Sequence, residues 1–185
     1  RTPSGNSFTI RDKVSTLTYS WFMEARTLHA PLDALSAANR PQGIEIATLT
    51  TFDIPALAAL SLEAYGDDVT PEALLETSEE LRLTFEGAFG ATTEDSFIGA
   101  WDGGTLVGAI LVVRESPWDD APDGPFVVDL IVAPDYRRRG IATALVSEVA
   151  TRCSRWGFDS LALRLDTRHG GARELYSVLG FEEIA

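Results

Sequence analysis

Residues 126–144, FVVDLIVAPDYRRRGIATA, decide how the rest of the chain is arranged. They begin with the run FVVDLIVA, in which only Asp129 is polar. Such a run, rich in Val and Ile, predicts a strand that is covered on both faces. A proline and an aspartate end the strand, three arginines follow, and an amphipathic helix begins after Gly140.

The corner between this strand and this helix carries a binding signal. The first N–H groups of a helix have no partner within the helix, and the helix dipole makes that end slightly positive. Together with Arg137, Arg138 and Arg139 they favour a bound phosphate group. We expect a pyrophosphate at this corner, and a solvated basic loop is the alternative.

Composition narrows the class of protein. The chain has 185 residues, of which 45% are hydrophobic and 23% are charged, as expected for one globular domain. Its single cysteine excludes an internal disulfide, and with no recognisable signal peptide we expect a cytoplasmic protein. The apolar runs are too short to span a membrane. The net charge of −13 argues against nucleic acid as a partner.

The remaining pattern alternates strands and helices irregularly, which predicts a mixed α/β or α+β sheet. The turn Asp102-Gly103-Gly104-Thr105 indicates a hairpin. Residues 27–43 read as a connection with at most a short helix. Strands are expected at 14–23, 44–49, 96–101, 106–114, 126–133 and 160–166 and from residue 181, and helices at 53–65, 70–86, 141–156 and 170–180.

Two ordered motifs identify a family. Residues 137–142, RRRGIA, fit the pattern R/Q-x-x-G-x-G/A, and they follow the hydrophobic segment at 130–134. Residues 172–181, ARELYSVLGF, fit A-x-x-L-Y-x-x-x-G-F. From about Ile44 onward the chain therefore resembles the GNAT superfamily of N-acetyltransferases. The resemblance implies a mostly antiparallel twisted sheet of about six or seven strands, flanked by about four helices.

The resemblance also implies acetyl-CoA as cosubstrate and no metal. Gly140 would let the phosphates approach the backbone closely. His169 stands where the family often has Asn, so its contact with the cofactor is open. The cofactor-binding residues implied are Leu130, Ile131, Val132, Arg137, Arg138, Arg139, Gly140, Ile141, Ala142, Thr143, His169, Ala172 and Tyr176.

The family's usual general acid corresponds to Tyr176, although a tyrosine on the apolar face of a helix is more often a core residue. Asp129 is the candidate base, because burial would raise its pKa; an ion-paired carboxylate is the alternative. Other candidate bases are ordered water, His169 and the residues around the end of the helix at 53–65, namely Glu63, Tyr65, Asp67 and Asp68. Tyr65, Asp67 and Trp118 are the expected acceptor-side residues.

The resemblance implies transfer of an acetyl group from acetyl-CoA to a primary amine by direct attack in a ternary complex. A non-catalytic acyl-CoA sensor is the alternative. The acceptor would be a small-molecule or peptide amine, and a homodimer is possible. We expect neither nucleic acid nor a membrane as partner.

The N-terminal segment, residues 1–43, precedes a main body at 44–185. The family usually ends with a strand inserted beside the strand that follows the cofactor helix. Here the chain stops at Ala185, and its beginning resembles that ending. We therefore hypothesise a circular permutation in which residues 14–23 lie beside the strand at 160–166. An N-terminal extension, with the last strand supplied by a partner chain, is the alternative.

Overall fold

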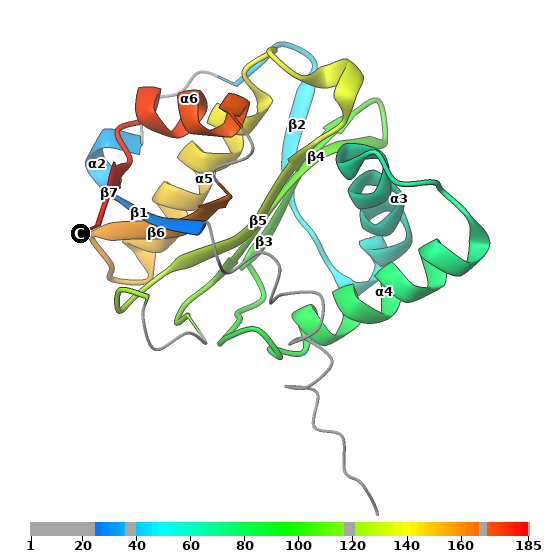
Figure 1. Cartoon of the computed structure of the whole chain (residues 1–185), viewed down its shortest axis with the longest axis horizontal. Coiled ribbons are helices and arrows are strands. Elements are labelled where there is room, and N and C mark those ends of the chain that lie inside the picture. The colour runs from blue at the N-terminus through cyan, green and yellow to red at the C-terminus, as the bar shows by residue number, and fades with distance from the viewer. Residues whose placement is uncertain (1–24, 36–39, 117–120, 167–169, 185) are drawn as a thin grey trace, which may run out of the picture.

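The computed structural model describes residues 25–35, 40–116, 121–166 and 170–184, which form a seven-stranded sheet between two layers of helices (Figure 1). The strand order is β2-β3-β4-β5-β6-β1-β7. The strands are β1 (Ala25–Pro31), β2 (Ile44–Thr48), β3 (Phe97–Asp102), β4 (Thr105–Val113), β5 (Phe126–Val132), β6 (Ser160–Asp166) and β7 (Glu182–Glu183). The helices are α2 (Leu32–Leu35), α3 (Ile54–Tyr65), α4 (Pro71–Phe85), α5 (Ile141–Arg155) and α6 (Gly170–Val178), with short 3-10 helices η1 (Thr51–Asp53) and η2 (Pro134–Tyr136).

Most neighbouring strands are antiparallel, and β5 and β6 form the one parallel pair in the described residues. The predicted hairpin joins β3 to β4 through Gly103 and Gly104, whose φ values of 54° and 87° suit a tight two-residue turn. The predicted fold class is confirmed, with α2 as one helix more than expected.

The sheet carries a hydrophobic core on each face. Helices α3 and α4 cover one face, while α2, α5 and α6 lie on the other (Figure 1). Leu57 of α3 and Leu145 of α5 are both fully buried, one in each core. A sheet buried on both sides explains why β4 is apolar almost without interruption.

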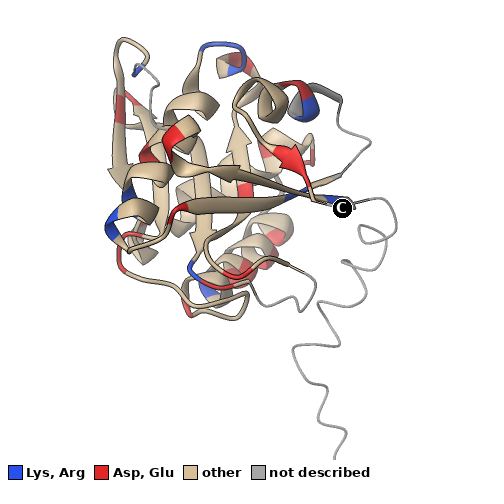
Figure 2. Cartoon of the chain, turned by 90° about the vertical axis from the view of Figure 1, so that its left-hand side faces the viewer, with Lys and Arg blue, Asp and Glu red and all other residues tan. Residues whose placement is uncertain are grey.

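Acidic residues dominate the surface of the protein. Figure 2 marks Asp and Glu positions on several helices and on β7, whereas Lys and Arg occupy fewer places. Within the described ranges, no helix combines the length and the apolar character that a membrane span requires.

The N-terminal strand corrects one prediction. Residues 27–31 were expected to be a connection, but they belong to β1, which pairs antiparallel with β6 from Ala25 opposite Asp166 to Pro31 opposite Ser160. The prediction was wrong because only Leu28 and Ala30 show the alternating burial that is typical of a strand, and because the strand ends in a proline. The predicted strand at 14–23 lies outside the described residues. Residues 25–31 therefore lie beside β6, while the hypothesised placement of residues 14–23 stays a prediction.

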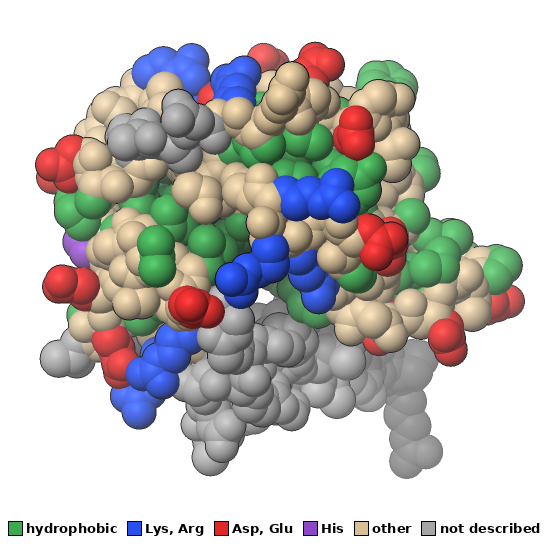
Figure 3. All heavy atoms as spheres, turned by 90° about the horizontal axis from the view of Figure 1, so that it is seen from above, with side chains coloured by type: hydrophobic (Ala, Val, Ile, Leu, Met, Phe, Trp, Pro, Cys, Tyr) green, Lys and Arg blue, Asp and Glu red, His purple; other side chains and the backbone are tan. Residues whose placement is uncertain are grey.

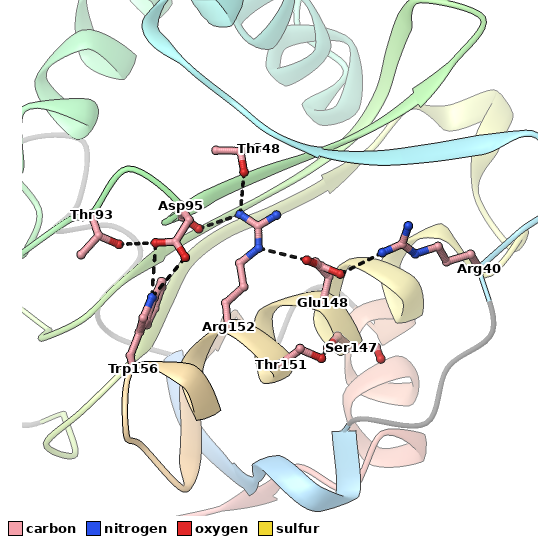
Figure 4. Close-up of polar contacts among 9 residues, drawn as sticks. All are labelled: Arg40, Thr48, Thr93, Asp95, Ser147, Glu148, Thr151, Arg152 and Trp156. Atoms are coloured by element: carbon pink, nitrogen blue, oxygen red, sulfur yellow. Dashed lines mark hydrogen bonds and ion pairs between the residues drawn. The ribbon is translucent and has the colours of Figure 1, made fainter.

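A buried arginine joins α5 to the end of β2 and to the segment before β3 (Figure 4). The Arg152 guanidinium donates to Thr48 Oγ1 at 2.9 Å, to the Asp95 carbonyl at 2.9 Å and to Glu148 Oε1 at 3.1 Å. The Trp156 indole N–H donates to the Asp95 carboxylate at 3.2 Å. Only 6% of Arg152 is exposed, so its charge depends on these partners.

We expect Arg152→Ala to lower the free energy of unfolding by about 3 kcal/mol, because it leaves Glu148 and the Asp95 carbonyl without their buried donor. Urea denaturation measures the change. Arg155→Ala, at an exposed position of the same helix, is the matched control and should cost less than about 1 kcal/mol. Equal losses in the two variants would contradict a special role for Arg152.

Candidate functional site

The parallel strands β5 and β6 separate after their first residues. They pair only at Phe126 opposite Ala162 and at Val127 opposite Leu163, and beyond these pairs the two strands diverge (Figure 1). The rest of β5, including Leu130, Ile131 and Val132, therefore has a backbone edge with no strand partner in the described residues. Unpaired strand groups of this kind can bind an extended ligand through hydrogen bonds.

The loop after β5 presents a row of free backbone donors. The first helical hydrogen bond of α5 runs from the Ala144 N–H to the Gly140 carbonyl at 3.0 Å. The N–H groups of residues 138–143, which include Ile141, Ala142 and Thr143 in the first turn, donate to no other described residue. Such an array at a helix N-terminus is suited to binding an anion.

Two residues of this loop have left-handed backbone conformations. Arg138 has φ of 62°, which is rare for a residue other than glycine, and Gly140 has φ of 80°. A Cβ built on Gly140 would meet only Pro41 Cγ, at 3.8 Å. Glycine is therefore favoured at this position by the left-handed backbone conformation, and not by a lack of space for a side chain. Strain of the kind found at Arg138 is concentrated at functional sites.

The three arginines of the motif have different surroundings. The Arg137 guanidinium donates through Nε to the Val132 carbonyl at 3.2 Å and through Nη2 to the Ala64 carbonyl at 2.6 Å. Its side chain is therefore held by the ends of β5 and α3. We expected it to contact the cofactor.

Arg139 instead lies over an aromatic ring in the same loop. Its Cζ is 4.9 Å from the centre of the Tyr136 ring, and the Tyr136 hydroxyl donates to Asp102 Oδ2 at 2.8 Å. This hydrogen bond raises the pKa of Tyr136. From above, basic side chains gather near the middle of this face of the protein, beside exposed hydrophobic surface (Figure 3). The contact between Asp102 and Tyr136 was not predicted, and no sequence pattern pointed to it.

Tyr65, Asp129 and Tyr176 lie together beside the free edge of β5. The Tyr65 hydroxyl donates to Asp129 Oδ1 at 2.7 Å. Burial raises the pKa of Asp129, while the hydrogen bonds from Tyr65 and from the Leu130 N–H act in the opposite direction. Although 47% of Tyr65 is exposed, burial around its hydroxyl also raises its pKa.

The second phenol of this cluster has no hydrogen-bond partner in the part of the chain that the structure describes. Tyr176 is 8% exposed, its ring packs edge-on against Phe181 at 5.5 Å, and its hydroxyl makes no hydrogen bond to a described residue. Burial raises its pKa, and the negative charge of Asp129 adds to the effect. The cluster thus combines a carboxylate with a raised pKa and a protonated phenol, which are a candidate base and a candidate acid.

The other expected site residues are less informative. Asp67, Glu63 and Asp68 are exposed at the end of α3, and Ala172 is in α6. Trp118 and His169 lie outside the described residues. Among the residues that are described, no group of three or more His, Cys, Asp or Glu side chains is arranged to bind a metal ion.

Comparisons with known proteins point to one family. A family model described as "Acetyltransferase (GNAT) family" matches residues 56–181. A curated relative, the mycothiol acetyltransferase of Kocuria rhizophila, is 37% identical over 106 residues, which are 55% of this chain and 31% of the relative. This chain therefore matches about a third of the length of that relative.

Solved structures share the fold. A GCN5-related N-acetyltransferase from Sphaerobacter thermophilus aligns over 86% of this chain and 48% of its own, with a TM-score of 0.62 and 24% identity. The ribosomal-protein-S18-alanine N-acetyltransferase of Escherichia coli aligns over 77% of this chain and 79% of its own, with a TM-score of 0.56 and 20% identity. At these identities the likeness concerns the fold alone.

The raised pKa of Asp129 has a consequence for stability. The unfolded chain releases this proton near pH 3.9, whereas the folded protein holds it to higher pH. Between the two pKa values the folded state binds more protons, so its stability falls as the pH rises. Asp129→Asn removes this titration and keeps an oxygen that accepts from Tyr65.

We therefore expect the difference in free energy of unfolding between the variant and the wild type to change in favour of the variant as the pH rises from about pH 4 to about pH 8. Urea denaturation of both proteins at the two pH values measures the difference. The pKa of Asp129 is not raised if the difference in free energy of unfolding is the same at both pH values, or if it changes in favour of the wild type at the higher pH.

Proposed function

Because the chain belongs to the acetyltransferase (GNAT) family, we propose that it transfers the acetyl group of acetyl-CoA to a primary amine. The observation that carries the proposal is the row of free N–H donors at residues 138–143, next to the unpaired edge of β5. We treat residues 1–185 as a single acetyltransferase domain, which is supported by the single sheet that joins β1 to the strands of the main body.

The loop donors suit the pyrophosphate of acetyl-CoA. Two phosphates carry negative charge, and the N–H groups of residues 138–143 with the start of α5 provide partners for several of their oxygens. Arg138 and Arg139 add positive charge. The pantetheine arm, which contains amide groups, would lie along the free edge of β5 and pair with the backbone of Leu130 and Val132.

The acid and base cluster then suits the chemistry of acyl transfer in a ternary complex. The amine nitrogen attacks the thioester carbonyl carbon, a C–N bond forms, and the C–S bond breaks. Asp129 accepts the proton from the amine, and its raised pKa makes it a stronger base than an ordinary carboxylate. Tyr176, whose hydroxyl has no partner among the described residues, gives its proton to the departing thiolate.

The acceptor side favours a positively charged molecule. Asp67 and Asp68 are exposed directly after Gly66, and the chain has a net charge of −13. Negative potential of this kind raises the local concentration of cationic substrates, and small-molecule or peptide amines are cations at neutral pH.

We expect Gly140→Ala to weaken binding of CoA by about tenfold or more. A left-handed conformation costs a residue with a Cβ about 1–2 kcal/mol, so the loop would relax and move its N–H groups. Gly157→Ala is the matched control, because Gly157 has φ of 91°, nothing within 4 Å of its Cβ position, and lies at the other end of α5. Isothermal titration calorimetry with CoA measures both variants. Equal affinities in both would contradict the proposed phosphate site.

We expect Tyr176→Phe to lower kcat by about 10²–10⁴-fold at saturating acetyl-CoA, because the thiolate would leave without its acid. Thiol release in the presence of a panel of amines and peptides measures turnover, and calorimetry checks that CoA affinity is kept. Turnover near the wild-type level would remove Tyr176 from the mechanism. Binding of CoA without acetylation of any amine by the wild type would favour the non-catalytic sensor.

A further inference from the structure

We propose that Arg137 is a positioning residue that acts through helix α3: it holds Tyr65 against Asp129, and its side chain does not bind the phosphates. The inference rests on the proposed function for its catalytic meaning, because it assigns Asp129 as the base. Its structural part stands on the hydrogen bonds of Arg137 and Tyr65 alone.

The five residues involved form a closed ring of contacts. Arg137 joins the Val132 carbonyl, at 3.2 Å, to the Ala64 carbonyl, at 2.6 Å. Ala64 directly precedes Tyr65, whose hydroxyl donates to Asp129 at 2.7 Å. Asp129 is on the same strand as Val132. Because the guanidinium is planar and its donors are fixed relative to one another, it sets the distance between the end of α3 and the end of β5.

A positive charge stabilises the C-terminal end of helix α3. The carbonyls in the last turn of a helix lack helical partners, and the dipole favours positive charge there. Helix α3 has no basic residue in its own last turn and stops at Gly66, which has φ of 79°. Arg137, which follows Tyr65 by many residues in the sequence, supplies both the charge and the donor.

The same contacts separate the roles of the three arginines. A guanidinium that donates to the carbonyls of Val132 and Ala64 has fewer donors left for phosphate. The side chains of Arg138 and Arg139, together with the backbone N–H groups, then provide the positive charge at the phosphate site. The loop that would hold the cosubstrate is thereby attached directly to the helix that carries Tyr65.

The proposal predicts how the proton affinity of Asp129 responds. Among the described residues, the titratable group that acts on the pKa of Asp129 is Tyr65 from α3, and the charge of Asp129 in turn raises the pKa of Tyr176 from α6. Its paired neighbour on β4 is the apolar Leu111, and the charged side chain described on β6 is Arg164. Since the Tyr65 hydrogen bond lowers the pKa of Asp129, releasing Tyr65 must raise that pKa.

The experiment follows the carboxyl carbon of Asp129 by ¹³C NMR in protein labelled at aspartate and titrated with acid, without any substrate. Asp129→Asn identifies the resonance. We expect Arg137→Met and Tyr65→Phe each to raise the pKa of Asp129, and we expect the double variant to raise it no further than Tyr65→Phe does. Arg138→Met, at the exposed neighbouring position, is the matched control and should leave the titration unchanged.

Two results would overturn the proposal: an unchanged titration in Arg137→Met, or a double variant whose shift is the sum of the single shifts. If Arg137→Met does not fold, Arg137→Lys carries the test, because its single ammonium cannot reproduce the planar fork and should give an intermediate shift. In an assay with an identified amine, the acid limb of kcat/KM against pH should move up in both single variants. If the pKa of Asp129 shifts as expected in the NMR titration but the protein acetylates no amine, the proposed function is refuted and the positioning role stands.

Discussion

Backbone N–H groups that find no partner among the described residues are the constraint on which this structure depends. A buried or half-buried donor must be satisfied by water or by a ligand. Here the donors are concentrated at residues 138–143, where strand β5 gives way to helix α5. The left-handed conformations at Arg138 and Gly140 turn the chain so that successive N–H groups are exposed together. The corner is consequently strained and polar within an otherwise regular sheet.

The second feature of the site is a charge placed where solvation is poor. Asp129 interrupts an apolar strand, and burial makes its charged form less favourable than in water. Tyr65 compensates for part of that cost with one short hydrogen bond. A carboxylate that is only partly compensated keeps its affinity for a proton, which is the property that a base requires. Stability and reactivity therefore oppose each other at this residue.

The sequence could predict those parts of the fold that depend on local patterns. Strand β5, helix α5, the hairpin at Gly103 and Gly104, and the end of α3 at Gly66 follow from hydrophobic periodicity and from residues suited to left-handed conformations. The polar residue in the apolar strand pointed to Asp129, and the motif at 172–181 pointed to Tyr176. Strand β1 was missed, because its stability comes from β6, far away in the sequence, and its own pattern is weak. The partners of Arg137 could not be predicted either, since they depend on where two distant elements end in space.

The insertion of β1 between β6 and β7 has a consequence for how the protein folds. Segments from the two extremes of the described chain must meet before the sheet is complete, and the entropy of closing so large a loop has to be overcome before the new hydrogen bonds compensate for it. Pairings of such high contact order form slowly. For this reason, assembly of the half of the sheet that contains β6 should limit the folding rate. This half includes the strand that diverges from β5.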